Sequence, residues 1–397
     1  MGYLEAEAAV VHGRIVEGFR APYREDLSFK TVIVPGFSDG HAHPQVVDAG
    51  LIPGRRWRDS YEWLEGRRLR VDERAVRGDE ELASRLAAAT FARSLLEGVT
   101  LVAVTGRLGA NVRGWLSLPA RPRAVFLPTV MDRAGWPSIG EVEREIGRLV
   151  GVLGDGLAKI GVFAHSLATT RPESVRRALK AAASLRGVLG MHMSEGLPEL
   201  PRLLEVLGRG PYPTRIVAVH CTEIERLPPG VHCISCPASN MILYGRTRPT
   251  LAGVEGFGSD WPLLIGSTPR HLPLISGLYP GRVSEILRKA TIGGYRAYLV
   301  RHEGDFVAYD EDLEEVLSGR ALPVWVSIAG VPAVVEGELR GSGLAYVDVV
   351  KMAEEAVREA FDKYGDGAKP YIPSLEDLTA AGGGRASIAG ARGAFWG

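Results

Sequence analysis

The stretch VPGFSDGHAH, residues 34–43, decides how this sequence is interpreted. An apolar, β-branched run over residues 31–37 predicts a strand that leads into it. In a strand, residues i and i+2 point to the same side, so His41 and His43 could grip one metal ion together. Imidazole is a leading zinc ligand, but two ordinary loop histidines would show the same spacing. The pair therefore needs support from the rest of the chain.

Strand and helix signals alternate after this stretch. Further strands are predicted at residues 99–104, 124–127, 157–163, 188–191, 216–219, 231–235 and 254–258. A helix is predicted over residues 80–97, another begins at Ser138 with Glu141 at capping-box spacing, and a third runs from Pro172 to about residue 185. Strands that alternate with helices predict an α/β fold, a (β/α)8 TIM-type barrel, with a doubly wound open sheet as the alternative.

The two ends of the chain follow a different pattern. Residues 1–30 and 305–340 hold short strand-like pieces with turns between them, which predicts one small β-sandwich domain built from both ends. We therefore divide the chain into this domain (1–35 and 303–345), the barrel (36–302) and a C-terminal part (346–397). In the last part, residues 345–363 predict an amphipathic helix, and residues 365–397 form a Gly/Ala-rich tail or docking arm.

Composition excludes several classes of protein. The 397 residues carry 47 basic and 47 acidic side chains, so no bulk positive charge exists to hold nucleic acid or an anionic membrane. No apolar run reaches the ~18 residues of a membrane span, and the N-terminus lacks a signal-peptide pattern. We expect a cytoplasmic protein with three reduced cysteines at 221, 233 and 236. Only two Asn and one Gln occur beside 40 Arg, which suggests a thermophile.

Polar side chains follow the ends of several predicted strands, where a barrel builds its active site. His192 and Glu195 lie in GMHMSE (190–195), His220 follows an apolar strand, and Asp260 follows the last strand. Each motif also has an ordinary structural interpretation. Glu195 could be an acidic residue in the first turn of a helix, His220 a buried core histidine and Asp260 a helix cap. Their recurrence at successive strand ends favours one metal site, with Glu195 beside it as a proton shuttle.

Taken in order, these motifs resemble the amidohydrolase superfamily, and within it the branch of cytosine/adenosine-type deaminases and chlorohydrolases. VPGFSDGHAH resembles the opening strand of that family, and HMSE (192–195) resembles its His-x-x-Glu. CPASN (236–240) resembles its Pro-x-Ser-Asn turn, and GSD (258–260) its Gly-Thr/Ser-Asp. The resemblance covers roughly residues 1–340. It fails past Glu65, where GRRLRVDE replaces the usual Pro-x-Glu arrangement, so the substrate stays open.

The resemblance implies a role for each of these residues. One divalent ion, Zn²⁺ or alternatively Fe²⁺, would be held by His41, His43, His192 and Asp260. Glu195 would be the general acid/base, while His220 and Asp260 would orient the attacking water. His165 would face the substrate. Trp63, in the long loop over residues 44–79, would close over a flat ring or else only pack against the barrel mouth.

The implied activity is hydrolysis of a carbon–nitrogen bond other than a peptide bond. Hydroxide formed at the metal would attack the C–NH₂ carbon of a purine, pyrimidine or nucleoside-like ring, and Glu195 would move the proton. Two alternatives remain: a related hydrolase that expels chloride or opens a cyclic amide, and a catalytically silent paralogue that binds a ligand. The partner is expected to be a small molecule, with no nucleic acid or membrane, and a homodimer is left open.

Other polar residues receive structural interpretations. Lys159, six residues before His165, lies near the start of its strand, which argues against the bridging lysine of a two-metal site. The three cysteines cannot complete a zinc ribbon and are expected to be buried. Arg107, Arg113 and Arg133 follow the second and third strands and either bind an anionic tail or are solvated.

Overall fold

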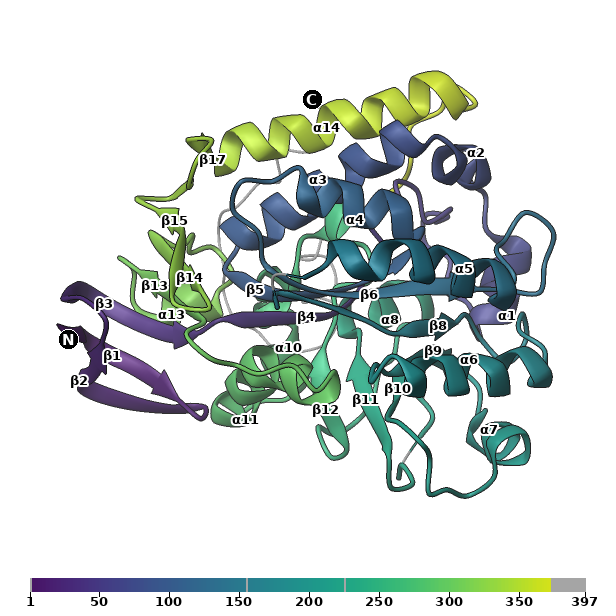
Figure 1. Ribbon diagram of the computed structural model, residues 1–397, viewed down its shortest axis with the longest axis horizontal. Coiled ribbons are helices and arrows are strands. Elements are labelled where there is room, and N and C mark those ends of the chain that lie inside the picture. The colour runs from purple at the N-terminus through teal and green to yellow at the C-terminus, as the bar shows by residue number, and fades with distance from the viewer. Residues whose placement is uncertain (1, 155, 225, 373–397) are drawn as a thin grey trace.

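The computed structural model describes residues 2–154, 156–224 and 226–372. A barrel of parallel strands forms the body of the molecule, a second sheet lies at one end, and the long helix α14 (Tyr346–Tyr364) crosses the barrel helices (Figure 1). The predicted tail begins in the described part, but residues 373–397 lie outside it. None of the helices in the described ranges has the length and apolarity needed to cross a bilayer.

The barrel follows the predicted order of strands, and its neighbours pair in parallel; the short strands β7 and β8 both pair with β6, and β8 continues the barrel to β9. A parallel bridge between Ala42 and Asp260 joins its first and last strands. This bridge confirms the barrel over the open sheet. The strands are β4 (Phe37–Ala42), β5 (Val99–Gly106), β6 (Arg123–Val130), β7 (Ala158–Ile160), β8 (Val162–Ala164), β9 (Leu189–Met193), β10 (Ile216–His220), β11 (Val231–Ser235) and β12 (Val254–Phe257).

Helices surround these strands, and the sequence signals locate their starts. Ser138 caps α5 with the predicted box: its side chain accepts from the Glu141 N–H, and the Glu141 carboxylate accepts from the Ser138 N–H at 2.7 Å. Pro172 is the first residue of α6. The outer helices are α3 (Glu80–Leu96), α4 (Leu108–Leu116), α5 (Ile139–Leu149), α6 (Pro172–Ser184), α7 (Leu200–Leu207), α8 (Pro237–Tyr244), α9 (Pro262–Ile265), α10 (Leu272–Leu278), α11 (Val283–Arg288) and α12 (Gly294–Ala297).

The first predicted strand, residues 31–37, is wrong as a barrel strand. This apolar run is divided between two sheets: β3 (Leu27–Pro35) belongs to the end sheet, and the barrel begins at Phe37. Gly36 lies between the two strands, and a Cβ there would lie 1.9 Å from the Thr100 Oγ1. Only glycine allows this close approach. As a result His41 lies inside the barrel strand, and His43 lies just past it.

The second sheet is built from both chain ends, as predicted. Its first three strands come from the N-terminus, and β13 pairs antiparallel with β3, Phe306 opposite Pro35. Phe29 and Trp325 pack edge to face across it, 5.9 Å between ring centroids. The division into domains at residues 36 and 303 stays a prediction. The strands are β1 (Gly2–Val11), β2 (Arg14–Tyr23), β3, β13 (Phe306–Tyr309), β14 (Trp325–Ile328), β15 (Val331–Val335), β16 (Glu338–Leu339) and β17 (Leu344–Ala345); α13 (Leu313–Leu317) follows β13.

Candidate active site

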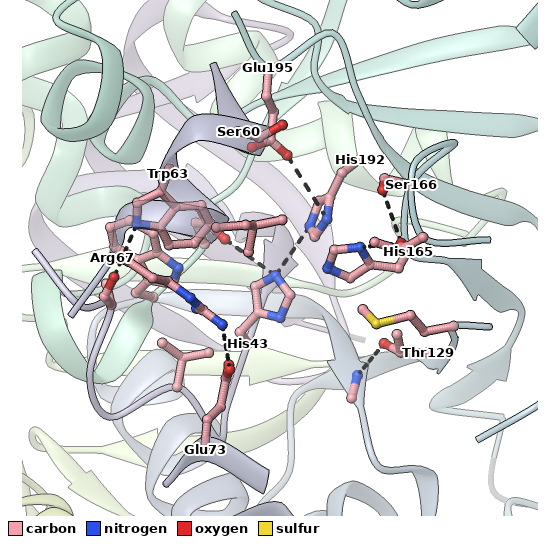
Figure 2. Close-up of a pocket in the computed structure, with 18 of the residues that line it drawn as sticks. His43, Ser60, Trp63, Arg67, Glu73, Thr129, His165, Ser166, His192 and Glu195 are labelled. Carbon is pink, nitrogen blue, oxygen red and sulfur yellow. Dashed lines mark hydrogen bonds and ion pairs between the residues drawn. The ribbon is translucent and has the colours of Figure 1, made fainter. Parts of the chain in front are cut away.

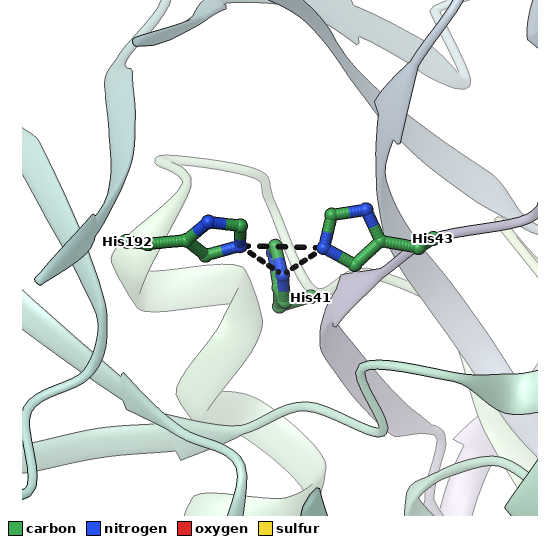
Figure 3. Close-up of side chains that lie close together, drawn as sticks. All are labelled: His41, His43 and His192. Carbon is green, nitrogen blue, oxygen red and sulfur yellow. Dashed lines mark hydrogen bonds between the residues drawn. The ribbon is translucent and has the colours of Figure 1, made fainter. Parts of the chain in front are cut away.

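Three histidines point their Nε2 atoms at one another at the carboxyl end of the barrel (Figure 3). The Nε2–Nε2 distances are 3.0 Å between His41 and His43, 3.1 Å between His41 and His192, and 3.3 Å between His43 and His192. Asp260 Oδ1 lies 3.4 Å from the Nε2 of His43 and 3.6 Å from that of His41. The four predicted ligands therefore converge on one point.

The spacing of the three histidine nitrogens, with Asp260 close to two of them, is compatible with a tetrahedral metal site. A metal bound at ~2.0–2.1 Å by nitrogen and oxygen would place its ligands about 3.3–3.4 Å apart. Burial lowers the pKa of His41, His43 and His192, so the rings are neutral and offer lone pairs. Burial alone would raise the pKa of Asp260, but the histidines beside it hold that pKa well below its usual range. Neutral imidazoles and one carboxylate are a donor set that zinc prefers.

Backbone contacts at the ends of the first and last strands bring Asp260 to His41 and His43. The Asp260 N–H donates to the His41 carbonyl at 2.8 Å, and the His43 N–H donates to the Asp260 carbonyl at 2.8 Å. Asp260 has φ +68° and His220 has φ +73°, a left-handed conformation that costs non-glycine residues about 1–3 kcal/mol. The two strand ends therefore hold strain where the polar side chains meet.

Glu195 lies beside the histidines, with its carboxyl group buried. Its Oε1 is 3.2 Å from His220 Nε2 and 3.9 Å from His192 Nδ1. The Tyr244 hydroxyl donates to its other oxygen at 2.8 Å. Burial raises the pKa of Glu195 to about 8, against the opposing hydrogen bond from Tyr244. A carboxyl group whose pKa lies near neutrality can both accept and release a proton.

The His220 ring is oriented from its far side. Its Nδ1 donates to Asn240 Oδ1 at 2.9 Å, and the Asn240 amide donates in turn to Thr247 Oγ1 at 3.1 Å. With the proton on Nδ1, the neutral ring leaves Nε2 as an acceptor facing Glu195. His43 has a similar support, because Thr105 Oγ1 lies 2.8 Å from its Nδ1.

The cluster opens into a pocket that both predicted substrate-facing residues line (Figure 2). His165 packs edge to face on His192, 4.8 Å between ring centroids, and burial lowers its pKa to about 3. Trp63 lies on α1 (Ser60–Gly66), its ring 6.0 Å from that of Trp261, and its Nε1 donates to the Ala49 carbonyl. The loop over residues 44–79 thus forms part of the pocket wall.

Comparison with known proteins identifies the fold. No protein-family model matches this sequence. No curated protein matches it either. Among solved structures, an adenosine deaminase from Xanthomonas campestris with bound zinc matches with a TM-score of 0.71 and 19% identity over 91% of this chain and 98% of its own. An atrazine chlorohydrolase from Arthrobacter aurescens TC1 complexed with zinc matches with 0.69 and 15%, over 90% and 100%.

An amidohydrolase from Brucella melitensis matches with a TM-score of 0.66 and 18% identity, over 91% of this chain and 99% of its own. The chain has the amidohydrolase fold. In this barrel fold the carboxyl ends of the strands form the site, and the histidines, Glu195 and Asp260 all lie there.

Most of the residues that had received structural interpretations lie outside the cluster of histidines, Glu195 and Asp260. The Lys159 ammonium donates to the carbonyls of Tyr298 and Leu299 at 3.0 and 3.2 Å. The three cysteines are buried free thiols. Arg113 pairs with Glu80 on the surface. Arg133, by contrast, lines the pocket.

Three groups near the site were not found from the sequence. Tyr244 holds Glu195 from α8, 49 residues away along the chain. Arg67 and Arg77 line the pocket and share the carboxylate of Glu73. The signal that could have found Arg67 and Glu73 is the GRRLRVDE segment (66–73), which departs from the family pattern; Arg77 lies four residues beyond it.

Proposed function

We propose that this chain is a metal-dependent hydrolase of the amidohydrolase superfamily, and more narrowly an aminohydrolase that deaminates a small heteroaromatic ring. The observation that carries the hydrolase proposal is Glu195, and the narrower assignment to deamination is supported by the similarity to an adenosine deaminase. Glu195 is a buried carboxyl group with a pKa of about 8, held by Tyr244 and lying 3.2 Å from His220 Nε2, beside four convergent metal-ligand atoms. Such a group suits proton transfer at neutral pH.

The four convergent side chains would hold one divalent ion. The zinc in the two similar structures supports Zn²⁺, with Fe²⁺ as the alternative. When bound, the ion would lower the pKa of a water toward ~7 and polarise the reacting carbon. The proposed ligands are His41, His43 and His192, with Asp260, which lies 3.4 Å from His43 Nε2 and 3.6 Å from His41 Nε2.

The chain's own residues would then move the protons. Glu195, as a carboxylate, takes a proton from the attacking water at Oε1 and gives it to a ring nitrogen. His220 Nε2, an acceptor held by Asn240, helps to orient that water together with Asp260. A further proton passes through Glu195 to the amine, so that C–NH₂ and water become C=O and ammonia. His165 and Trp63 would contact the ring.

A second candidate is a hydrolase with chloride or a cyclic amide as the leaving group. It is favoured by the atrazine chlorohydrolase structure, whose TM-score of 0.69 is close to the 0.71 of the deaminase. The donor set and the proton shuttle would serve either reaction. The leaving group therefore has to be measured.

The test is product release by metal-loaded protein against aminopurines, nucleosides, cytosine, and amino- and chlorotriazines. We expect ammonia from one ring class. Chloride without ammonia would overturn deamination in favour of the second candidate. Silence across the panel, with about one metal per chain, would favour a cyclic-amide substrate, whereas little or no bound metal would favour a silent ligand-binding paralogue.

A further inference from the structure

One wall of the pocket carries two arginines that share a single carboxylate; Figure 2 shows one of them, Arg67, beside Glu73. Arg67 Nη2 lies 2.8 Å from Glu73 Oε2, and Arg77 Nη2 pairs with the other oxygen, Oε1. All three side chains are largely withdrawn from water, with exposed fractions of 18%, 12% and 15%. Arg67 directly follows α1, and Glu73 and Arg77 lie on the short helix α2 (Glu73–Gly78).

This wall has more positive than negative charge. Glu73 is ionised at neutral pH because, against the effect of burial, Arg77 and Arg67 lower its pKa to about 2. One negative charge thus faces two positive ones. Arg133 also lines the pocket and, among the residues described, has no carboxylate within ion-pair distance. Charges withdrawn from water are stable only when compensated, so the wall favours an anionic ligand.

The two guanidinium groups have unused donors. Each carries five N–H groups, yet within the described ranges each guanidinium donates only to Glu73. Glu73 itself shows that a carboxylate fits between them, one oxygen on each arginine. Arg77 also stacks over the Trp136 ring, 4.1 Å from its centroid, and Arg67 lies 5.0 Å from that of Trp63. These ring contacts hold the guanidinium planes in place beside flat apolar surfaces.

The pocket wall formed by Arg67, Glu73 and Arg77 (the arginine wall) is continuous with the proposed reaction centre. Trp136, under Arg77, lies 6.3 Å from His165 between ring centroids, and His165 lies 4.8 Å from His192. The cavity that these residues share with the metal-ligand cluster encloses about 150 Å³. A small molecule that reaches the histidines can therefore also reach the arginines.

We propose that the substrate carries a carboxylate, which binds to Arg67 and Arg77 while its ring lies at the histidine end of the pocket. The substrate class is thus an amino-substituted heteroaromatic acid rather than a neutral base. The inference rests on the proposed function, because it assigns the substrate of that same pocket. It makes Arg67 and Arg77 the specificity-determining residues.

The test compares two probes of equal size, nicotinate and nicotinamide, which differ in the charge of one substituent. Their binding to the full chain is measured by calorimetry, with and without metal. Nicotinate is expected to bind at least about tenfold more tightly in both forms, as a charge-assisted contact provides. In Arg67→Gln and in Arg77→Gln this preference falls to near parity.

Two further variants separate charge from damage to the fold. Glu73→Gln removes the competing carboxylate and is expected to tighten nicotinate binding. A disordered loop could not produce opposite shifts in Glu73→Gln and Arg67→Gln. Arg113→Gln is the matched control, because Arg113 pairs with Glu80 on the surface, at exposed fractions of 58% and 60%. It should leave both affinities unchanged.

Equal affinity for the two probes in the unmodified chain would overturn the inference. So would a preference for nicotinate that Arg67→Gln and Glu73→Gln both leave intact. Ammonia release from neutral rings without a preference for acids would overturn the inference and leave the proposed function standing. A nicotinate preference that depends on Arg67, with no hydrolysis of any ring, would support the carboxylate site and count against the function.

Discussion

The two ends of the barrel hold buried polar clusters of opposite character. At the carboxyl end, three neutral imidazole nitrogens crowd within 3.3 Å of one another, and Asp260 and His220 have strained backbone. At the amino end, where β6 begins, Arg123 pairs with Asp305 at 2.7 Å, and Tyr295 donates to the same carboxylate at 2.9 Å.

Every group in the second cluster has a complementary partner. Asp305 also accepts from the Ala329 N–H at 2.6 Å, so its ion pair with Arg123 joins the barrel to the end sheet. In the first cluster, like groups face one another, and His41 Nδ1 is buried with no partner in the part of the chain that the structure describes. The comparison teaches that one end of the barrel is arranged for stability and the other for binding and chemistry.

Removal of the metal should have the largest effect. A bound metal supplies several kcal/mol of transition-state stabilisation, so chelation or His41→Ala should lower turnover by about 10³-fold or more. Metal content, measured by a metal assay, and turnover should fall together. Added Zn²⁺ should restore the turnover of the chelated protein. His232→Ala is the control, since His232 lies outside the cluster and pairs with Glu255. Equal losses of metal and turnover in His41→Ala and His232→Ala would contradict the assignment of His41 as a metal ligand.

Breaking the Arg123–Asp305 ion pair at the amino end of the barrel should lower stability rather than turnover. Arg123→Met leaves Asp305 buried without its cation, which should lower the free energy of unfolding by roughly 3–5 kcal/mol. Urea denaturation measures this loss, and kcat of the folded fraction should not change. Arg20→Met, which breaks an exposed pair with Glu5, should cost less than about 1 kcal/mol. A large fall in kcat for Arg123→Met would contradict the assignment of the amino-end cluster to stability alone.

Glu73, the carboxylate that Arg67 and Arg77 share, predicts a pH dependence of the free energy of unfolding. The pKa of Glu73 is about 2 in the folded chain and ~4.3 in an unfolded one. Its contribution, on the order of 3 kcal/mol, is therefore fully present above pH ~4.3 and is lost as pH falls toward 2. Acid unfolding of Glu73→Gln should lack this part of the pH dependence. Identical acid profiles for the two proteins would contradict it.

The smallest effect concerns the support of Glu195. Tyr244→Phe removes the 2.8 Å hydrogen bond to Oε2, which should lower kcat about tenfold at unchanged metal content. Steady-state kinetics should show the loss in kcat rather than in KM. Tyr212→Phe, whose hydroxyl donates only to the Gly208 carbonyl in the described structure, is the control. A wild-type kcat in Tyr244→Phe would show that Glu195 does not depend on this contact.

The sequence carried most of the barrel and the metal-ligand cluster because both follow local rules. Alternating strands and helices imply the barrel, and residues at strand ends then meet without knowledge of any contact, as His41 and His192 do. The strand predicted over residues 31–37 runs across the domain boundary that we predicted between residues 35 and 36, because the sequence on both sides is equally apolar. The close approach of Thr100 to Gly36 could not be predicted, because Thr100 lies far along the chain.

The supports of the site could not be predicted for the same reason. Tyr244 reaches Glu195 across 49 residues, and no spacing rule links a helix tyrosine to a carboxyl group at another strand end. Arg67, Glu73 and Arg77 lie in a segment without regular periodicity, whose course depends on packing over the barrel mouth. Residues placed by strand ends were therefore predictable, and residues placed by loops were not.

The most direct test measures metal content and ammonia release on the same preparations of the unmodified chain and Glu195→Gln. Both proteins should hold about one metal ion per chain, and Glu195→Gln should lose about 10²–10⁴-fold in turnover, as expected for the loss of a general acid/base. Turnover equal to that of the unmodified chain at equal metal content would contradict the role of Glu195, and with it the proposed function.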